Sequence, residues 1–207
     1  MRRTAPLACP LLLCAPLAQA ADTGSYAGLH AGLGQYDYTN PPAGSRSGFC
    51  DPAASSCDKR DVGYKLYAGY LFNRYLGVEG SAWSMGDGKL TYNNFFGTTL
   101  TQTVRLNGYG LSFVGGVPLG RAHVVARAGY AASTVTRKDS LGGVQVGRFE
   151  KTRTDPVFGA GAGVRVWNDL HVRLDWDRAR GRTQFGEKFE ADLFSLGLMY
   201  VFGPVGK

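Results

Sequence analysis

Eight amphipathic segments run along this 207-residue chain, and the connections between them are alternately long and short. In all but one of these segments apolar side chains recur at every second position, which predicts a β-strand with one apolar face. The predicted strands cover residues 25–38, 62–72, 75–84, 103–117, 121–133, 156–167, 170–178 and 193–202. For residues 103–117 the hydrophobic pattern does not define the facing clearly.

The alternation of connection lengths decides the predicted architecture. Transmembrane β-barrels have short periplasmic turns, long external loops and strands of about 9–11 residues across the bilayer. Closure is required because no sheet edge can stay unpaired in hydrocarbon. The sequence therefore predicts an all-β fold, an eight-stranded antiparallel up-and-down transmembrane β-barrel over residues 21–207. Aromatic residues near the strand ends would form two interfacial girdles: Tyr26, Tyr36, Phe72, Tyr75, Trp167, Trp176 and Tyr200.

The first twenty residues have the features of a secretory signal peptide. Arg2 and Arg3 form a positive start, residues 7–17 are mostly apolar, and residues 18–20 (Ala-Gln-Ala) supply a cleavage site. We expect residues 1–20 to be removed, so that the mature chain begins near Ala21. Beyond this segment, no apolar run reaches the roughly 18 residues that a membrane helix needs.

Two cysteines remain after cleavage, Cys50 and Cys57, in a polar segment rich in Pro, Gly and Ser. In an oxidising periplasm a pair this close is expected to form a disulfide within a loop. A zinc site is a weaker interpretation, because no histidine or third cysteine lies nearby in the sequence. We expect a structural disulfide and predict neither a cofactor nor a metal site.

Three stretches carry a resemblance to known families: residues 63–80 (GYKLYAGYLFNRYLGVEG), 158–178 (FGAGAGVRVWNDLHVRLDWDR) and the final SLGLMYVF. They resemble the small eight-stranded barrels of the OmpA-like and OmpX/Ail-like outer-membrane families. The ending is similar to the C-terminal insertion signal of such barrels, which the barrel-assembly machinery reads; the matching residues are Ser195, Gly197, Tyr200 and Phe202. The resemblance implies an integral protein of the outer membrane of a Gram-negative bacterium, in contact with its lipid and lipopolysaccharide.

If the apolar faces meet lipid, the opposite faces fill the lumen. Five charged residues then point inward near mid-height: Lys65, Glu79, Arg127, Arg173 and Asp175. An interior enclosed by eight strands is just wide enough for side chains, so these charges are expected to pair. The network is interpreted as a structural plug, and a narrow or gated pore is the alternative.

The predicted external loops are basic. The third and fourth loop regions carry Arg137, Lys138, Arg148, Lys151, Arg153, Arg178, Arg180, Arg182 and Lys188. Arginine suits bidentate contacts with phosphate, so lipopolysaccharide is a candidate ligand; an ordinary solvated surface explains the same charges. The second loop exposes Tyr92, Phe95 and Phe96, which could anchor a protein partner or pack over the barrel mouth. The formal net charge of +7 favours anionic lipid over nucleic acid in a secreted protein.

The function predicted from these features is structural or interactive: adhesion or host-factor binding through the external loops, by a monomer. A small-solute porin, a lipid A-modifying enzyme and a soluble secreted barrel are the alternatives. The chain has three histidines, His30, His123 and His171, and none falls in a predicted external loop. No histidine-based catalytic pair can therefore assemble at the outer rim, and no enzymatic activity is expected.

Overall fold

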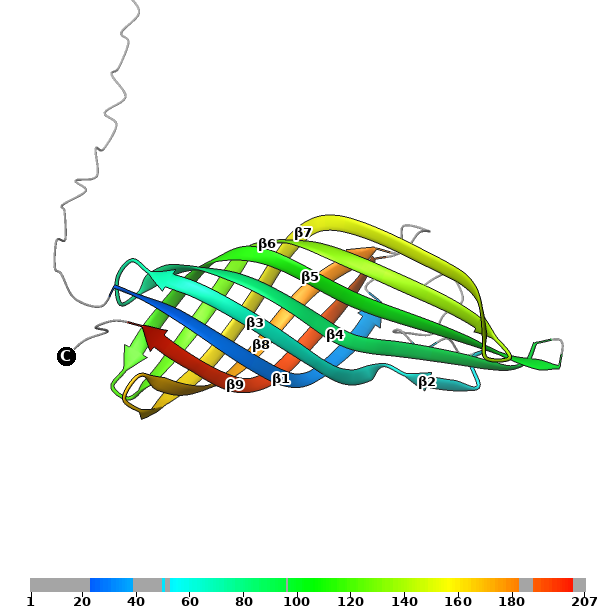
Figure 1. Ribbon diagram of the computed structural model, residues 1–207, viewed down its shortest axis with the longest axis horizontal. Coiled ribbons are helices and arrows are strands. Elements are labelled where there is room, and N and C mark those ends of the chain that lie inside the picture. Colours follow the sequence, from blue (N-terminus) through cyan, green and yellow to red (C-terminus); the bar gives the residue numbers. More distant parts are fainter. Residues whose placement is uncertain (1–22, 39–49, 51–52, 96, 183–187, 203–207) are drawn as a thin grey trace, which may run out of the picture.

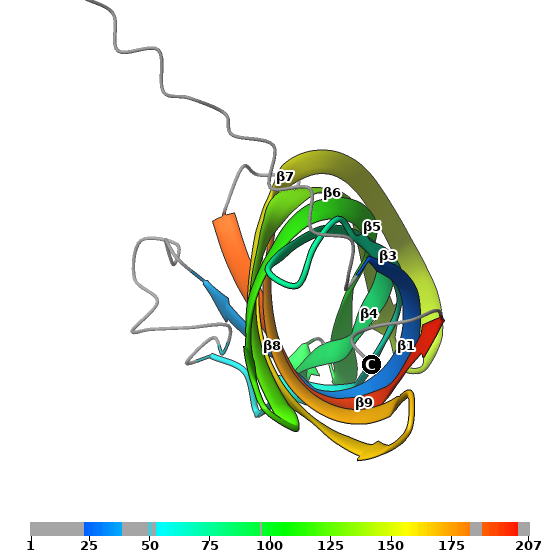
Figure 2. The ribbon, with the colours of Figure 1, turned by 90° about the vertical axis from the view of Figure 1, so that its left-hand side faces the viewer.

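The computed structural model describes residues 23–38, 50, 53–95, 97–182 and 188–202. Within these residues antiparallel strands form one sheet that closes on itself, as Figure 2 shows in a view along the barrel. The signal peptide predicted for residues 1–20 lies outside the described residues. No helix long and apolar enough to cross a membrane occurs in the described part of the chain. The strands are β1 (Gly24–Tyr38), β2 (Ser56–Asp58), β3 (Arg60–Leu71), β4 (Leu76–Phe95), β5 (Thr98–Leu119), β6 (Ala122–Leu141), β7 (Val144–Trp167), β8 (Leu170–Arg182) and β9 (Lys188–Phe202).

The ring consists of eight long strands, as predicted. Each long strand pairs with the strands before and after it in the chain, and β1 pairs with both β3 and β9 to close the circle. His30, for example, faces Lys65 on β3 and Gly197 on β9. Strand β2 is an unpredicted addition of three residues that pairs with the external part of β4.

An apolar band surrounds the outside of the ring. Leu29, Leu66, Leu111, Phe113 and Leu198 all point outward, and the Phe113 side chain is 74% exposed. A soluble protein would not leave this much contiguous apolar surface in water, whereas a membrane barrel presents such a band to lipid. The predicted facing is confirmed for β1, β3 and β9, and the structure defines that of β5, which the sequence left open.

Aromatic residues lie at the end of the band where β1 begins and β9 ends. Phe72, Tyr75 and Trp167 are exposed there, as predicted. The prediction was wrong for Tyr26 and Tyr36, which are buried inside the barrel at 4% and 0% exposure. Both occupy even positions on β1, the same side of the strand as the inward-facing His30, so they cannot also face lipid.

The long connections predicted for residues 85–102 and 134–154 are strands. β4 continues to Phe95 and β5 begins at Thr98, and β6 and β7 meet at Gly142 and Gly143. Both of these glycines have positive φ, 57° and 85°, which suits a tight hairpin turn. Figure 1 shows the result, a barrel whose wall extends on one side as a sheet built from β4, β5, β6 and β7.

Along β5 the apolar side chains change sides without a break in the pairing. Tyr109, Leu111 and Phe113 point outward, but further up the strand Leu106 and Val104 are buried on the inner side. Water replaces lipid around the extension, so the inner side becomes the apolar one. The resulting outer core consists of Tyr36, Trp83, Met85, Leu90, Val104, Leu106, Ala131, Val135, Ala179, Ala191 and Leu193.

The predicted disulfide lies next to this extension. Cys50 and Cys57 form a disulfide with a Cα–Cα distance of 5.6 Å. Cys57 lies in β2 opposite Leu90 of β4 and packs against the outer core. The bond therefore ties Cys50 to the short strand, which pairs with β4 beyond the residues that pair with β3.

A matched pair of substitutions on β5 tests the position of the membrane. Phe113→Arg places a charge near the middle of the apolar band and is expected to lower the free energy of unfolding by about 2–4 kcal/mol. Thr101→Arg places the same charge on the same side of β5, but in the external sheet. It is expected to change the free energy of unfolding by less than about 0.5 kcal/mol. Urea unfolding in lipid vesicles measures both, and equal effects would contradict this placement.

Candidate functional site

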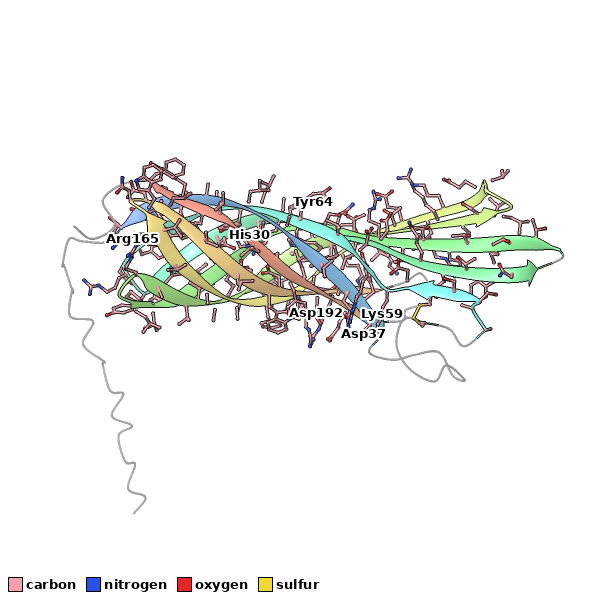
Figure 3. The ribbon with its side chains drawn as sticks, turned by 90° about the horizontal axis from the view of Figure 1, so that it is seen from below. His30, Asp37, Lys59, Tyr64, Arg165 and Asp192 are labelled. Atoms are coloured by element: carbon pink, nitrogen blue, oxygen red, sulfur yellow. A yellow bond between two sulfur atoms is a disulfide. The ribbon has the colours of Figure 1, made fainter. Side chains whose placement is uncertain are left out.

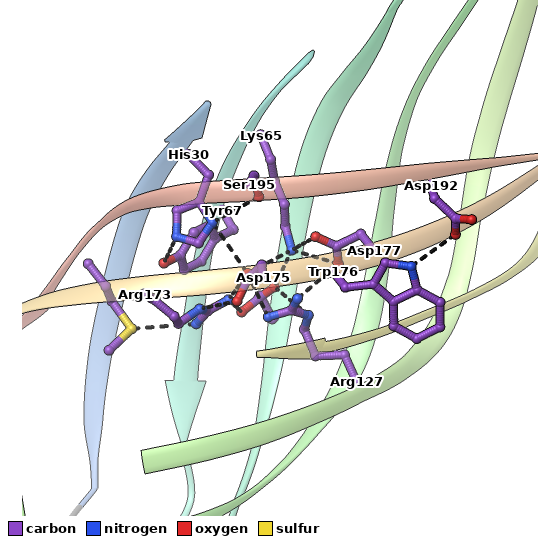
Figure 4. A network of polar contacts seen from close by, with 12 residues as sticks. His30, Lys65, Tyr67, Arg127, Arg173, Asp175, Trp176, Asp177, Asp192 and Ser195 are labelled. Carbon is purple, nitrogen blue, oxygen red and sulfur yellow. Dashed lines mark hydrogen bonds and ion pairs between the residues drawn. The ribbon is translucent and has the colours of Figure 1, made fainter. Parts of the chain in front are cut away.

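Charged residues from four strands meet inside the barrel at the level of the apolar band (Figure 4). β3 contributes Lys65, β4 Glu79, β6 Arg127, and β8 both Arg173 and Asp175. Each is at most 5% exposed. All five residues that alternation places in the lumen are thus brought together in one cluster, which we call the lumenal ion network.

Asp175 and Glu79 lie at the centre of the lumenal ion network. Asp175 is 2.7 Å from Nη2 of Arg173 and 3.0 Å from Nη1 of Arg127. Glu79 is 3.4 Å from Nζ of Lys65, 3.4 Å from Arg173 and 3.7 Å from Arg127. Each of the two buried carboxylates is therefore shared between several cations, as buried charges require.

Asp177 is a sixth member that was not among the predicted site residues. Its carboxylate is 3.0 Å from Nζ of Lys65 and 2.9 Å from Nη2 of Arg127. The signal was present in the sequence, because Asp177 shares the inward side of β8 with Asp175. With Asp177 included, the network contains three cations and three carboxylates, so its formal charges balance.

Neutral groups complete the network on its periplasmic side. The Tyr26 hydroxyl donates a hydrogen bond to Glu79 at 3.1 Å, and the Arg173 guanidinium lies 4.3 Å from the centre of the Tyr67 ring. His30 contacts the Tyr67 hydroxyl through Nε2 at 3.1 Å and the Ser195 hydroxyl through Nδ1 at 3.3 Å. These contacts hold the charged side chains in place from below.

A small residue makes room for the central carboxylate. Gly161 of β7 faces Asp175 across the strand pair, and a β-carbon at this glycine would lie 2.1 Å from Oδ1 of Asp175. Any larger residue would displace the carboxylate from its cations. The glycine-rich inner face of β7 is thus part of the network's geometry.

The lumen is filled at this level and above it. The cavity beside Lys65 and Arg127 has a volume of only about 20 Å³, enough for roughly one water molecule. Beyond it lies the outer core, packed with Trp83, Met85 and Leu106. Within the described residues, the network and the outer core fill this part of the lumen with side chains.

The predicted lipopolysaccharide contacts are divided between the two sides of the external sheet. Lys138 and Arg148 point outward and line a groove of about 170 Å³ together with Arg105. Arg137, Lys151 and Arg153 occupy alternate positions on the opposite side, and Arg137 pairs there with Asp139 at 3.0 Å. Arg105 was not predicted; its hydrogen bonds with Asp87 raise the pKa of its guanidinium.

The fourth loop region holds paired rather than free charges. Arg178 bonds Asp192 at 2.8 Å and Arg180 bonds Glu190 at 3.0 Å, both across the β8–β9 pair. The side chains of Arg182 and Lys188 lie outside the described residues, as do those of Phe95 and Phe96. Tyr92 of the second loop packs against the outer core.

The remaining predicted site residues lie on β9 and near the periplasmic turns. Ser195 and Gly197 face the lumen, whereas Tyr200 and Phe202 point outward with ring centroids 4.9 Å apart. His123 and His171 form a pair at the periplasmic end, far along the strands from the external sheet. No group of three or more His, Cys, Asp or Glu side chains that could hold a metal ion was found among the described residues.

A closed antiparallel ring with a lipid-facing apolar band and ion pairs inside defines the class of protein, a small transmembrane β-barrel of the outer membrane. Residues 5–202 match the family model described as the outer membrane protein beta-barrel domain. The chain belongs to this family and is an integral protein of the outer membrane.

Solved structures share the fold at low sequence identity. Neisserial surface protein A (NspA) is 12% identical with a TM-score of 0.56, covering 86% of this chain and 98% of its own. Ail of Yersinia pestis, crystallised with the heparin analogue sucrose octasulfate, is 12% identical with a TM-score of 0.52, covering 86% and 99%. OprG of Pseudomonas aeruginosa is 11% identical with a TM-score of 0.51, covering 88% and 98%. Among curated protein sequences, none matches this chain significantly.

The balance of charges in the lumenal ion network leads to a stability prediction. Arg127→Met leaves an uncompensated buried carboxylate and is expected to cost about 3–5 kcal/mol of unfolding free energy. Adding Asp177→Asn restores neutrality, so the double variant should recover at least half of that loss.

Arg180→Met is the control, because its ion pair with Glu190 is solvent-exposed and worth about 0–1 kcal/mol. Urea unfolding in vesicles measures all three variants. A double variant less stable than Arg127→Met alone would show that the charges are not coupled.

Proposed function

We propose that this protein is a non-conducting, non-catalytic outer-membrane barrel that binds a protein partner through its external sheet. The observation that carries the proposal is an open strand edge outside the membrane. β7 pairs with β8 only over Phe158–Trp167, so the preceding residues 144–157 have β6 as their only strand partner among the described residues. An exposed edge of this length is a template for the addition of an extended segment from another protein.

The other edge of the external sheet is covered. Ser56, Cys57 and Asp58 of β2 pair with Thr91, Leu90 and Lys89 of β4, and the disulfide restrains this strand. Among the described residues, the longest stretch of strand without a second partner is therefore on the β7 side. This asymmetry supports a specific role for β7 over a general tendency of the sheet to associate.

Apolar side chains accompany the open edge. Val144 and Val146 are 67% and 61% exposed at the tip of the β6–β7 hairpin, well away from the lipid-facing band. An added strand would gain backbone hydrogen bonds from β7 and apolar contact from these valines. By its name Ail is an attachment invasion locus protein and NspA a surface protein, which agrees with a surface role for a similar fold.

Adhesion of whole cells tests the proposal. Cells that display the wild-type protein are expected to be retained on epithelial monolayers above the empty-vector level, and Val144→Lys/Val146→Lys is expected to abolish most of the gain. Charged residues on an edge strand oppose strand addition. Thr99→Lys/Thr101→Lys is the control, because it places the same two charges at the same level of the sheet on β5, an interior strand.

Equal retention of both lysine variants would refute the role of the β7 edge. Conductance in planar bilayers is measured on the same preparations to test the alternative of a porin. Single-channel steps that change with Glu79→Gln or Arg127→Met would replace the proposal by a conducting lumen. No steps are expected from the wild-type protein.

A second proposal concerns lipopolysaccharide. The outward groove of Arg105, Lys138 and Arg148 lies above the apolar band, on the side of the sheet that continues the lipid-facing surface. Its guanidinium and ammonium groups suit phosphate or sulfate. A sulfated sugar in the crystals of Ail shows that one barrel of similar fold takes such a ligand, which supports an anionic ligand here.

Binding of purified lipopolysaccharide to the protein in zwitterionic micelles checks this second proposal. Arg105→Gln/Arg148→Gln is expected to weaken binding about tenfold at low salt and less at high salt, because ions screen exposed charges. Arg137→Gln/Lys151→Gln removes the same charge from the opposite side of the sheet and should leave binding unchanged. If both double variants weaken binding equally, the contact is non-specific.

A further inference from the structure

The periplasmic end of the lumen is hollow, unlike the rest of the interior. A cavity of about 320 Å³ opens there, and its inner end is closed by Arg173 of the lumenal ion network. Val114, Val125 and Val201 form apolar walls. Figure 3 labels one residue of its rim, Arg165, at the end of the barrel opposite the external sheet. This periplasmic vestibule has no role in the function proposed above.

Positive charge dominates the rim of the periplasmic vestibule. Arg121 and Arg165 belong to adjacent strand ends, and Nη2 of Arg121 lies 3.4 Å from the Arg165 carbonyl oxygen, to which it donates. No carboxylate of the described residues lies within ion-pair distance of either guanidinium. Arg74, stacked on Tyr75, adds a third cation, and Asp169 is the acidic residue of the lining.

Two imidazole rings line the vestibule. The rings of His123 and His171 are 5.2 Å apart between centroids and inclined at 66°. Gly163 of β7 leaves the space that the His123 ring occupies. Nε2 of His123 and Nδ1 of His171 are shielded from solvent and have no hydrogen-bond partner among the described residues. The two rings therefore report on a ligand in the cavity through their surroundings.

The surrounding charges decide which kind of ligand fits. Two imidazoles beside the thioether of Met199 could suit a soft metal ion. However, His171 is within electrostatic reach of Arg165 and, more weakly, of Asp169, and His123 is within reach of Arg173 and, more weakly, of Asp175. The stronger influence of the positive charges opposes a cation here and favours an anion. Arginine, moreover, binds phosphate in a bidentate manner.

We infer that the periplasmic vestibule binds a phosphate group through the guanidinium groups of Arg121 and Arg165, next to the imidazole rings of His123 and His171. The valine walls leave room for a short apolar body attached to that phosphate. Two sources share this chemistry: a free phosphate compound of the periplasm and the head group of a phospholipid in the inner leaflet.

The three histidines of the chain provide the measurement, because His30 is an internal reference sealed within the network. The protein, with ¹³C-labelled histidine, is titrated with inorganic phosphate in zwitterionic micelles at constant pH and ionic strength. The ring resonances of His123 and His171 are expected to shift and saturate, whereas those of His30 stay in place.

Arg165→Gln is expected to raise the phosphate Kd at least tenfold. Arg60→Gln, an exposed arginine at the external end of β3, should leave it unchanged. Arg165 is exposed at the rim, so its substitution is not expected to unfold the barrel. Resistance of the Arg165→Gln variant to SDS before heating verifies that it is folded. Equal Kd values for the two variants, or a drift of all three histidines together, would overturn the site.

Nanodiscs distinguish the two sources of phosphate. A shift of His123 and His171 when phosphatidylglycerol replaces phosphatidylcholine, without added phosphate, supports the site and identifies the head group as its ligand. A shift only on addition of phosphate supports the site with a soluble ligand. A saturable response to Zn²⁺ but not to phosphate would overturn the proposal in favour of a metal site.

Discussion

Hydrocarbon offers no hydrogen-bond partners, and this constraint determines the interior of the protein as well as its wall. Unpaired backbone groups are too costly in the bilayer, so the sheet must close. A ring of eight strands leaves an interior that side chains fill. Charges on the inner face, such as Glu79 and Asp175, must then be neutralised by neighbours within that narrow space, and the lumenal ion network follows from closure.

The same strands are solvated by lipid in one part and by water in another. In the bilayer the apolar side of β5 faces outward, with Phe113; in the extension it faces inward, with Leu106. The lower barrel therefore has polar groups at its centre, whereas the extension has an outer core like that of a soluble protein. Continuous strands such as β5 run through both parts without a break in the pairing with β6.

Alternation along the strands predicted the ring, its lipid-facing side and five members of the network, because a period of two identifies the apolar side of a strand as long as the strand stays in lipid. The prediction failed where a strand passes from lipid into water. The reversal between Tyr109 and Leu106 disrupts the hydrophobic pattern, so the extensions of β4 to β7 read as polar loops. Charge counts also could not separate Lys138 from Arg137, since neighbouring residues of a strand point to opposite sides. The vestibule depends on distances between β6 and β8, which sequence patterns do not contain.

The two edges of the external sheet differ in the length of backbone that they offer. A sheet with two long open edges can be extended strand by strand, because each added strand exposes a new edge. Here the three residues of β2, with the disulfide at Cys57, lie along one side of β4, whereas residues 144–157 of β7 have β6 as their only strand partner among the described residues. Association through the external sheet is therefore directional, because an extended partner can form more backbone hydrogen bonds along β7 than along β2.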